Sequence, residues 1–163
     1  MDDQAMSWTS LIFSKLTKAA AVVALFCGLV GGATVALPSA EAKAATLVAK
    51  VSLQKQRMQV YVDGRRKHTW VISTGKRGWR TKPGNYWPFK MQQRFYSKRW
   101  RMSLPYLVWI GQDGTAIHGT TYASRLGRPA SHGCIRLSIS NAAKFYRLVQ
   151  RHGMWGTRVE VTR

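Results

Sequence analysis

Alternation of apolar and polar residues marks where the folded part of this chain begins. Residues 47–53 and 58–62 carry apolar side chains at every second position, and a period of two places those side chains on one face of a β-strand. Asp63-Gly64 follows as a dipeptide typical of a tight hairpin turn, and residues 68–73 are rich in β-forming residues. This pattern predicts an antiparallel meander at the start of a domain.

A second hairpin is predicted farther along the chain. Residues 107–110 and 115–117 are mostly apolar or β-forming and flank the turn-forming residues 112–114. This hairpin would deliver His118 at the end of a strand, where a rigid scaffold can hold a catalytic side chain. Upstream of it, a proline-glycine pair interrupts the chain before a short extended stretch at residues 86–89.

The strongest helical pattern lies close to the C-terminus. Ser140 can cap the first turn, and Gly153 suits the end of the helix. Apolar side chains recur with helical spacing at Ala142, Phe145, Tyr146 and Val149. Residues 158–162 alternate again and predict a closing strand. Together the elements predict a mainly β fold with one principal α-helix that packs on a sheet.

The first 44 residues differ from the rest. Two lysines precede a long uncharged run at residues 19–37, and a proline and small residues follow it. This is the layout of a secretory signal peptide, with A-x-A cleavage sequences at residues 40–42 and 42–44. An uncleaved membrane anchor is the alternative, because the run is about long enough to cross a bilayer. We expect residues 1–44 to be the signal peptide, residues 45–163 to be one domain, and the protein to be exported to the periplasm or the cell wall.

The predicted mature chain is strongly basic. Residues 45–163 hold 23 of the 26 lysines and arginines but only three of the six acidic residues, so their formal net charge is +20. Such a charge attracts anionic polymers and surfaces without specifying a fold. These residues also hold a single cysteine, Cys134, which cannot form an intrachain disulfide. A free thiol in an exported protein suggests chemistry, because oxidising compartments normally pair cysteines.

The candidate chemistry is concentrated between His118 and Cys134. The segment begins with His118-Gly119 and ends with Ser-His-Gly-Cys at residues 131–134. A cysteine beside histidines suits nucleophilic catalysis, because an imidazole can remove the proton of the thiol. Two other interpretations are open, a zinc site with three ligands or an inert buried cysteine. Either histidine could be the base on these grounds, since His132 is near Cys134 in the chain and His118 comes from another strand.

The pattern resembles the active-site signature of the L,D-transpeptidase (YkuD) family of peptidoglycan enzymes. In that family a histidine is followed, after a loop, by Ser/Thr-His-Gly-Cys, an apolar residue and Arg or Asn, and Ile135-Arg136 completes the match here. The resemblance covers about residues 47–161 and implies a β-sandwich or barrel-like catalytic fold. It implies Cys134 as the nucleophile and His118 as the base, oriented by the backbone carbonyl of the next residue. It implies no metal and no cofactor.

Further roles are expected around this motif. His132 is assigned to a position beside the nucleophile, on the side of the developing oxyanion, and the oxyanion hole would use backbone N–H groups around residues 132–134. Gly133 and Gly119 are the expected backbone positions of the site. Arg136 could bind a substrate carboxylate through two parallel hydrogen bonds. The other expected substrate-binding residues are Ser131, Thr120 and Tyr122, and the loop of residues 120–130 could cover the site as a lid.

Residues 76–101 combine nine basic and seven aromatic residues with no acidic one. Aromatic residues among cations also occur in grooves for single-stranded nucleic acid. The export signal and the lack of a recognisable nucleic-acid module argue against such a partner, whereas peptidoglycan offers carboxylates and sugar faces. The same segment has Thr-Lys-Pro-Gly at residues 81–84, where the family commonly shows Thr-Pro-x-Gly, so the proline is shifted by one position.

The sequence therefore predicts an exported, cysteine-dependent L,D-transpeptidase. The resemblance implies attack on the third residue of a peptidoglycan tetrapeptide stem, release of the terminal D-alanine, and transfer of the resulting thioester to an amine acceptor. That acceptor could be a second stem, an outer-membrane lipoprotein or a free amino acid, and anionic cell-envelope polymers are further expected partners. Two alternatives stay open. One is an L,D-carboxypeptidase that uses water, and the other is a non-catalytic cationic module that binds the wall or nucleic acid.

Overall fold

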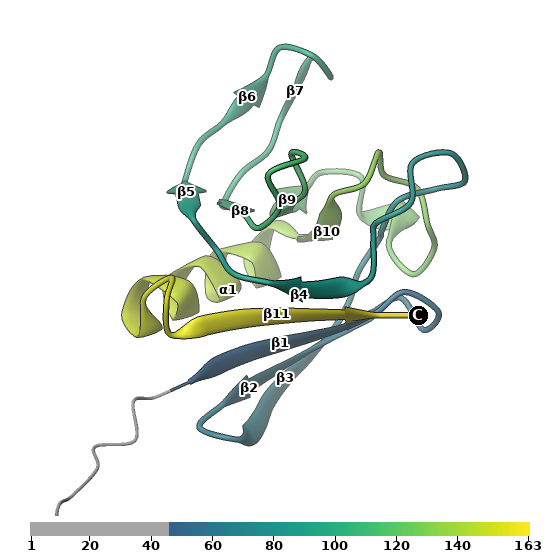
Figure 1. Cartoon of the computed structure of the whole chain (residues 1–163). Coiled ribbons are helices and arrows are strands. Elements are labelled where there is room, and N and C mark those ends of the chain that lie inside the picture. Colours follow the sequence, from purple (N-terminus) through teal and green to yellow (C-terminus); the bar gives the residue numbers. More distant parts are fainter. Residues whose placement is uncertain (1–45) are drawn as a thin grey trace, which may run out of the picture. The chain divides into compact units, whose positions relative to one another are not determined.

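The computed structural model describes residues 46–163, which form two main β-sheets and one α-helix (Figure 1). The predicted signal peptide, residues 1–44, lies outside the described residues. Within the described part, no helix is long and apolar enough to cross a membrane. In chain order the elements are β1 (Leu47–Ser52), β2 (Arg57–Val62), β3 (Arg65–Val71), β4 (Gly84–Tyr86), β5 (Lys90–Gln92), β6 (Tyr96–Ser97), β7 (Met102–Ser103), β8 (Leu107–Trp109), β9 (Ala116–Thr120), the 3₁₀ helix η1 (Ala123–Arg125), β10 (Ile135–Ser138), α1 (Ile139–His152) and β11 (Thr157–Thr162).

The first sheet combines the three N-terminal strands with the C-terminal strand and one strand from the middle of the chain. Its strand order is β3-β2-β1-β11-β4, with β1 antiparallel to β2 and parallel to β11. Every second residue of β1 is buried, so the predicted period of two is confirmed. The predicted hairpin turn is also confirmed, because Asp63 and Gly64 join β2 to β3 with φ angles of 50° and 73°. β3 begins directly after this turn at Arg65, earlier than the predicted start at residue 68.

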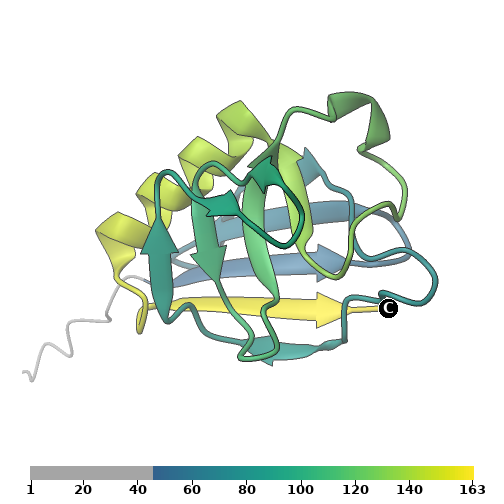
Figure 2. The same cartoon turned by 90° about the horizontal axis from the view of Figure 1, so that it is seen from above.

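The second sheet has the order β10-β9-β8-β5, and a short hairpin of β6 and β7 stands beside it as a separate pair. Figure 2 shows the strands of this sheet crossing those of the first. β8 and β9 form the predicted hairpin, with Val108 opposite Ile117. β9 continues to Thr120 because it also pairs in parallel with β10. His118 therefore lies inside a strand, and the prediction that it stands at a strand end is wrong.

The extended stretch predicted at residues 86–89 is also placed differently. β4 ends at Tyr86 and β5 begins at Lys90, and the two strands belong to different sheets. Pro88 lies between them and has no N–H to donate to a strand ladder. The chain leaves one sheet and enters the other at this proline.

α1 follows β10 without a connecting loop. Ser138, the last residue of β10, caps the helix by accepting a hydrogen bond from the N–H of Asn141 at 3.3 Å. The prediction of Ser140 as the cap is wrong, because Ser140 already lies in the first helical turn. Gly153 ends the helix, as predicted, with a φ of 74°. The predicted apolar stripe is confirmed by the burial of Ala142, Phe145 and Val149, with Tyr146 packed at the edge of the core.

One hydrophobic core joins both sheets and the helix. Buried side chains of β1, β2, β9, β10, β11 and α1 form one cluster, and α1 packs mainly against β9 and β10. Full burial of a Leu, Ile or Phe side chain contributes about 1.5–3 kcal/mol, so these strands are held firmly. The fold is mainly β with one α-helix, as the sequence predicts. The core thereby fixes the two strands that carry the candidate catalytic residues.

Candidate active site

Two neighbouring parallel strands direct the candidate catalytic residues to one face of the second sheet. β9 and β10 pair in register so that His118 lies opposite Arg136, and Cys134 precedes Arg136 by two residues at the entrance to β10. Side chains two positions apart in a strand share a face. The alternate positions, which face the core, hold the fully buried Ile117, Ile135 and Leu137. The alternation thus separates His118 and Arg136 from this core, while Cys134 packs against a second small apolar cluster formed by Leu104, Leu107 and Ala116.

His118 is a buried imidazole with a defined tautomer. It is 2% exposed, and its Nδ1 lies 2.7 Å from the carbonyl oxygen of Gly119. A carbonyl oxygen only accepts, so Nδ1 carries the proton and Nε2 keeps a lone pair. Burial lowers the pKa of His118 to about 4, and the charge of Arg136 adds to this, although the hydrogen bond to Gly119 acts in the opposite direction. His118 is therefore neutral at pH 7 and can accept a proton at Nε2.

Cys134 is a free thiol on the wall of a pocket. Its Sγ lies 3.7 Å from the carbonyl oxygen of Gly114 in the turn between β8 and β9, which suits a weak S–H hydrogen bond. Burial raises the pKa of Cys134, and the charge of Asp113 acts in the same direction, while the backbone of Ala116 and the charge of Arg136 act against it. Resting Cys134 is therefore a thiol, and it needs a base when it attacks.

Hydroxyl groups hold the Ser-His-Gly-Cys loop from both sides. Ser131 is fully buried, and its Oγ donates to the carbonyl of Cys134 at 2.6 Å and accepts from the N–H of Gly133 at 3.1 Å. Thr81 donates from Oγ1 to the carbonyl of Gly133 at 2.8 Å and accepts from the N–H of Gly75 at 2.9 Å. Gly133 has a φ of 112°, which residues with a side chain rarely adopt. These bonds fix the backbone that carries the thiol.

The two glycines expected in the site have backbone N–H groups that are already engaged. The N–H of Gly133 is bonded to Ser131, and the N–H of Gly119 donates to the carbonyl of Pro105 at 2.7 Å. Gly119 meets His118 through its carbonyl, and a Cβ at Gly119 would come within 3.1 Å of Pro105. An oxyanion role for the Gly133 N–H would require that group to leave Ser131, and the oxyanion hole stays a prediction.

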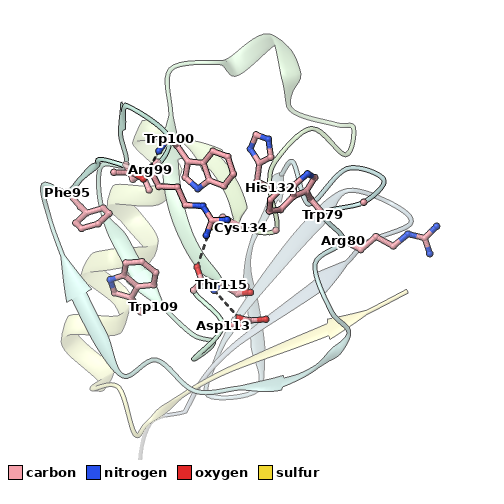
Figure 3. Close-up of a pocket in the computed structure, with 15 residues that line it drawn as sticks. Trp79, Arg80, Phe95, Arg99, Trp100, Trp109, Asp113, Thr115, His132 and Cys134 are labelled. Atoms are coloured by element: carbon pink, nitrogen blue, oxygen red, sulfur yellow. Dashed lines mark hydrogen bonds between the residues drawn. The ribbon is translucent and has the colours of Figure 1, made fainter.

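The pocket at Cys134 has a volume of about 450 Å³ and is rich in aromatic and basic side chains (Figure 3). Its lining consists of Gly78, Trp79, Arg80, Phe95, Ser97, Arg99, Trp100, Leu104, Trp109, Asp113, Gly114, Thr115, His132, Gly133 and Cys134. Seven of these residues come from residues 76–101, the basic and aromatic segment of the sequence. The segment therefore forms one side of the pocket that holds the thiol.

His132 packs between two tryptophans beside Cys134. Its ring stacks on Trp100 with the ring centroids 4.1 Å apart and the planes at 9°, and it meets Trp79 edge to face at 5.1 Å. Figure 3 shows the three rings together at the rim of the pocket, and Arg99 lies over the Trp100 ring at 5.0 Å. Burial lowers the pKa of His132, and nearby basic side chains add to this. His132 is thus an uncharged part of the pocket wall at pH 7, and its role in the reaction stays a prediction.

Arg136 is buried and is not among the residues that line the pocket. It is 7% exposed, its Nη1 donates to the carbonyl of Ala130 at 3.4 Å, and its Nε has no hydrogen-bond partner. Among residues 46–163, no carboxylate forms an ion pair with it. Its charge lowers the pKa values of both Cys134 and His118. Arg136 therefore acts on the site electrostatically in this conformation, and its binding of a substrate carboxylate stays a prediction.

Thr120 and Tyr122 lie where β9 leads into the predicted lid, outside the pocket wall. Thr120 is buried, and its Oγ1 accepts a hydrogen bond from the N–H of Tyr122 at 3.1 Å. Tyr122 is exposed, with the guanidinium of Arg125 over its ring at 5.4 Å. The loop of residues 120–130 is tied to the first sheet's end by a 2.8 Å hydrogen bond from the N–H of Gly127 to Ile72. The substrate contacts of these residues and the movement of a lid stay predictions.

Three of the nine predicted site residues thus line the pocket, namely His132, Gly133 and Cys134. Sequence reasoning missed Thr81 as a support of the site, although this threonine begins the Thr-Lys-Pro-Gly stretch that resembles a family sequence. It also missed that Trp79 and Trp100 converge on His132, because their distant positions carry no local signal of contact.

A zinc site is the alternative interpretation of the His and Cys motif. In the described part of the chain, no three His, Cys, Asp or Glu side chains gather in a way that could hold a metal ion. Such a site needs three or four ligands around one point. The arrangement of His118, His132 and Cys134 does not provide one.

Comparison with known proteins identifies what the chain resembles. The model of the L,D-transpeptidase catalytic domain (YkuD) family matches residues 47–161. A comparison with curated proteins found no match. Solved structures that match share the mainly β fold with one helix, so the predicted fold class is confirmed.

Three of these solved structures illustrate the range. An L,D-transpeptidase from Mycobacterium smegmatis is 22% identical, with a TM-score of 0.68 over 73% of this chain and 59% of that chain. L,D-transpeptidase 3 from Mycobacterium tuberculosis, in complex with a faropenem-derived adduct, is 24% identical, with a TM-score of 0.65 over 73% of this chain and 61% of that chain. An L,D-transpeptidase from Stackebrandtia nassauensis is 30% identical, with a TM-score of 0.64 over 72% of this chain and 56% of that chain. The chain thus spans about three fifths of the length of the structures it matches.

Proposed function

The chain belongs to the L,D-transpeptidase catalytic domain (YkuD) family, and on this premise we propose that it is a cysteine-dependent L,D-transpeptidase acting on peptidoglycan stem peptides. The observation that carries the proposal is a free thiol on a pocket wall, Cys134, directly before β10, while the neighbouring strand β9 carries a neutral imidazole, His118, whose Nε2 keeps its lone pair. Covalent acyl transfer requires a nucleophile and a base held on a rigid support. Here β9 and β10 are that support.

The proposed reaction has two steps. In the first, Sγ of Cys134 attacks the carbonyl carbon of the third stem residue while its proton passes to Nε2 of His118. The amide bond to the terminal D-alanine breaks, and its nitrogen leaves with that proton, so a thioester remains on Cys134. In the second, the amine of an acceptor gives a proton to Nε2 and attacks the thioester, which restores the thiol and forms a new amide.

The charges of the pocket suit this substrate. Stem peptides carry several carboxylates. Arg80 and Arg99 line the pocket together with one carboxylate, Asp113, and the chain as a whole has a net charge of +20. Negative charge that develops on the attacked carbonyl would be stabilised by backbone N–H groups near Cys134 and by the field of Arg136. Export to the periplasm or cell wall belongs to the same proposal, because peptidoglycan lies outside the cytoplasmic membrane and residues 1–44 have the layout of a signal peptide.

A β-lactam tests the nucleophile directly. The solved L,D-transpeptidase 3 from Mycobacterium tuberculosis is in complex with a faropenem-derived adduct, and we propose that a penem or carbapenem likewise acylates this protein once, on Cys134. Intact-mass measurement should show one adduct on the wild type and none on Cys134→Ala. The full chain has a second cysteine, Cys27. An adduct that persists in Cys134→Ala would show that another residue reacts, and it would contradict the assignment of Cys134.

A tetrapeptide stem then tests the reaction. Incubation with a muropeptide and a free amine acceptor should give an acceptor-linked tripeptide product and released D-alanine in the wild type, and neither in Cys134→Ala. Formation of a tripeptide acid alone, even at high amine concentration, would identify the protein as a carboxypeptidase and contradict the transferase proposal.

A further inference from the structure

The face of the domain next to the active site carries a second hollow with exposed aromatic residues. The chain between β4 and β5 and the loop between α1 and β11 lie close together (Figure 2), and with the turn between β8 and β9 they enclose a groove of about 320 Å³. Trp155 in this groove is 94% exposed, and Trp87 and Phe89 are also exposed. Large apolar side chains gathered in this way on a surface indicate a binding site.

The chemistry of this aromatic groove differs from that of the rest of the chain. None of its lining residues is charged, although the chain has a net charge of +20. Its polar side chains include the amides of Asn85 and Gln112, which make no hydrogen bond within residues 46–163. An amide offers two donors and an acceptor. The groove therefore presents flat apolar rings beside open, neutral hydrogen-bonding groups.

These properties select a ligand. The ring of a sugar has an apolar C–H face that stacks on an indole, and hydroxyl and acetamido groups at its edge that pair with amides. A carboxylate-rich peptide or an anionic lipid headgroup would favour cationic walls, such as those at Arg80 and Arg99 in the pocket of Cys134. We infer that the aromatic groove binds the glycan strand of peptidoglycan, an inference that rests on the proposed function of the neighbouring site.

The position of the groove supports this assignment. Gln112 lines the groove, whereas Asp113 and Gly114 line the catalytic pocket, so a single turn separates the two. Sγ of Cys134 lies 3.7 Å from the carbonyl of Gly114, and Gln112 is at most about 7 Å along the chain from Gly114. An extended stem reaches its third residue in roughly 10 Å. A sugar in the groove could therefore present its own stem peptide to Cys134.

The test uses the full chain and chitotetraose, a neutral N-acetylated oligosaccharide without a peptide. Titration is followed by calorimetry and by protection of tryptophan fluorescence from acrylamide, at about 1 M salt, where the screening length is about 3 Å. Wild-type protein should bind and become less quenchable. Trp155→Ala and Trp87→Ala should each weaken binding on the order of tenfold, the loss expected for one stacking ring. Tyr96→Ala is the matched control, because Tyr96 is 59% exposed, comparable to Trp87 at 50%, but lies outside the groove.

The outcomes separate this inference from the proposed function. Acylation of Cys134 by a β-lactam should proceed at the wild-type rate in Trp155→Ala, which also shows that the variant is folded. Absence of chitotetraose binding, or equal binding by wild type and both tryptophan variants, would overturn the groove assignment while leaving the enzyme intact. Oligosaccharide binding without acylation of Cys134 would instead refute the proposed function. Binding to phosphatidylcholine vesicles that is lost in Trp155→Ala, with no oligosaccharide binding, would overturn the inference in favour of a membrane surface.

Discussion

Lowering the pH should destabilise this domain mainly through His118. The pKa of His118 is about 4 in the folded protein and 6.5 for an ordinary histidine. Between these values the unfolded chain binds a proton that the folded domain does not, so the free energy of unfolding decreases as the pH falls from 6.5 toward 4. With about 1.4 kcal/mol for each tenfold difference in proton affinity, the expected loss between pH 7 and pH 4.5 is about 2.4 kcal/mol.

Other groups can be separated from this effect. Burial also lowers the pKa values of His68 and His132, so these histidines add to the loss in the same direction. A hydrogen bond with Thr115 is the main cause that lowers the pKa of Asp113. The stabilising contribution of this carboxylate is lost mainly below its ordinary pKa of 3.8, outside the interval. His118→Asn removes the titration alone, because an Asn amide can still donate to the carbonyl of Gly119 from the position of Nδ1.

The assay is urea unfolding of the wild type and His118→Asn at pH 7 and pH 4.5. The wild type should lose about 2.4 kcal/mol more than the variant between the two pH values. Equal losses would mean that His118 accepts a proton in the folded domain as easily as in the unfolded chain. The neutral, buried base on which the proposed mechanism depends would then be refuted.

Three further predictions concern the thiol, its loop and the charge. The rate of alkylation of Cys134 by iodoacetamide should increase with pH up to and beyond 8.5, because burial raises the pKa of Cys134. Even an unperturbed thiol is only about 3% thiolate at pH 7. A rate that reaches its plateau below pH 7 would instead reveal a thiolate-imidazolium pair. Thr81→Val should slow the acylation of Cys134 and lower the free energy of unfolding by about 1–3 kcal/mol, because the carbonyl of Gly133 and the N–H of Gly75 lose their hydrogen-bond partner. Thr121 is exposed, and Thr121→Val should change neither quantity. Binding of the chain to purified peptidoglycan should weaken strongly from about 0.05 M to 1 M salt, and salt-independent binding would exclude a leading role for the charge of +20.

The parts of the fold that the sequence predicts correctly are those with local causes. The alternation of apolar residues predicts β1 and β2, and Asp63-Gly64 predicts the turn that joins β2 to β3. Helical spacing of apolar residues predicts α1. The errors arise where distant segments decide. β9 extends through His118 to Thr120 only because β10 pairs with it in parallel, and a parallel partner is not visible in a local pattern.

The choice between two serines shows the same limit at a helix end. Ser138 and Ser140 have the same capping chemistry, and either fits the pattern before Asn141. The pairing of β10 with β9 ends at Ser138, which leaves its side chain free to meet the N–H of Asn141. The sheet therefore determines where the helix begins.

The candidate site divides in a similar way. The motif predicts one site for His118 and Cys134, and the structure places His118 on β9 next to β10, the strand that directly follows Cys134. The convergence of Trp79, Trp100 and His132 could not be predicted, because it depends on how the β6 and β7 hairpin and the loop before β4 fold over the cysteine. Composition predicts that residues 76–101 bind a substrate, but it could not place seven of them in the wall of the pocket that holds the thiol.

Arg136 shows why the reactive form of the site must arise with the substrate. Its positive charge lowers the pKa of Cys134, which favours the thiolate, but it also lowers the pKa of His118, which disfavours the imidazolium. The two effects oppose each other in the transfer of a proton from Cys134 to His118, so Arg136 cannot create a standing ion pair. Once the substrate carbonyl is attacked, negative charge moves from sulfur to oxygen, and a buried cation without a carboxylate partner can then stabilise that charge. In the proposed reaction, the field of Arg136 therefore favours the transition state more than it favours an ion pair between Cys134 and His118 in the resting site.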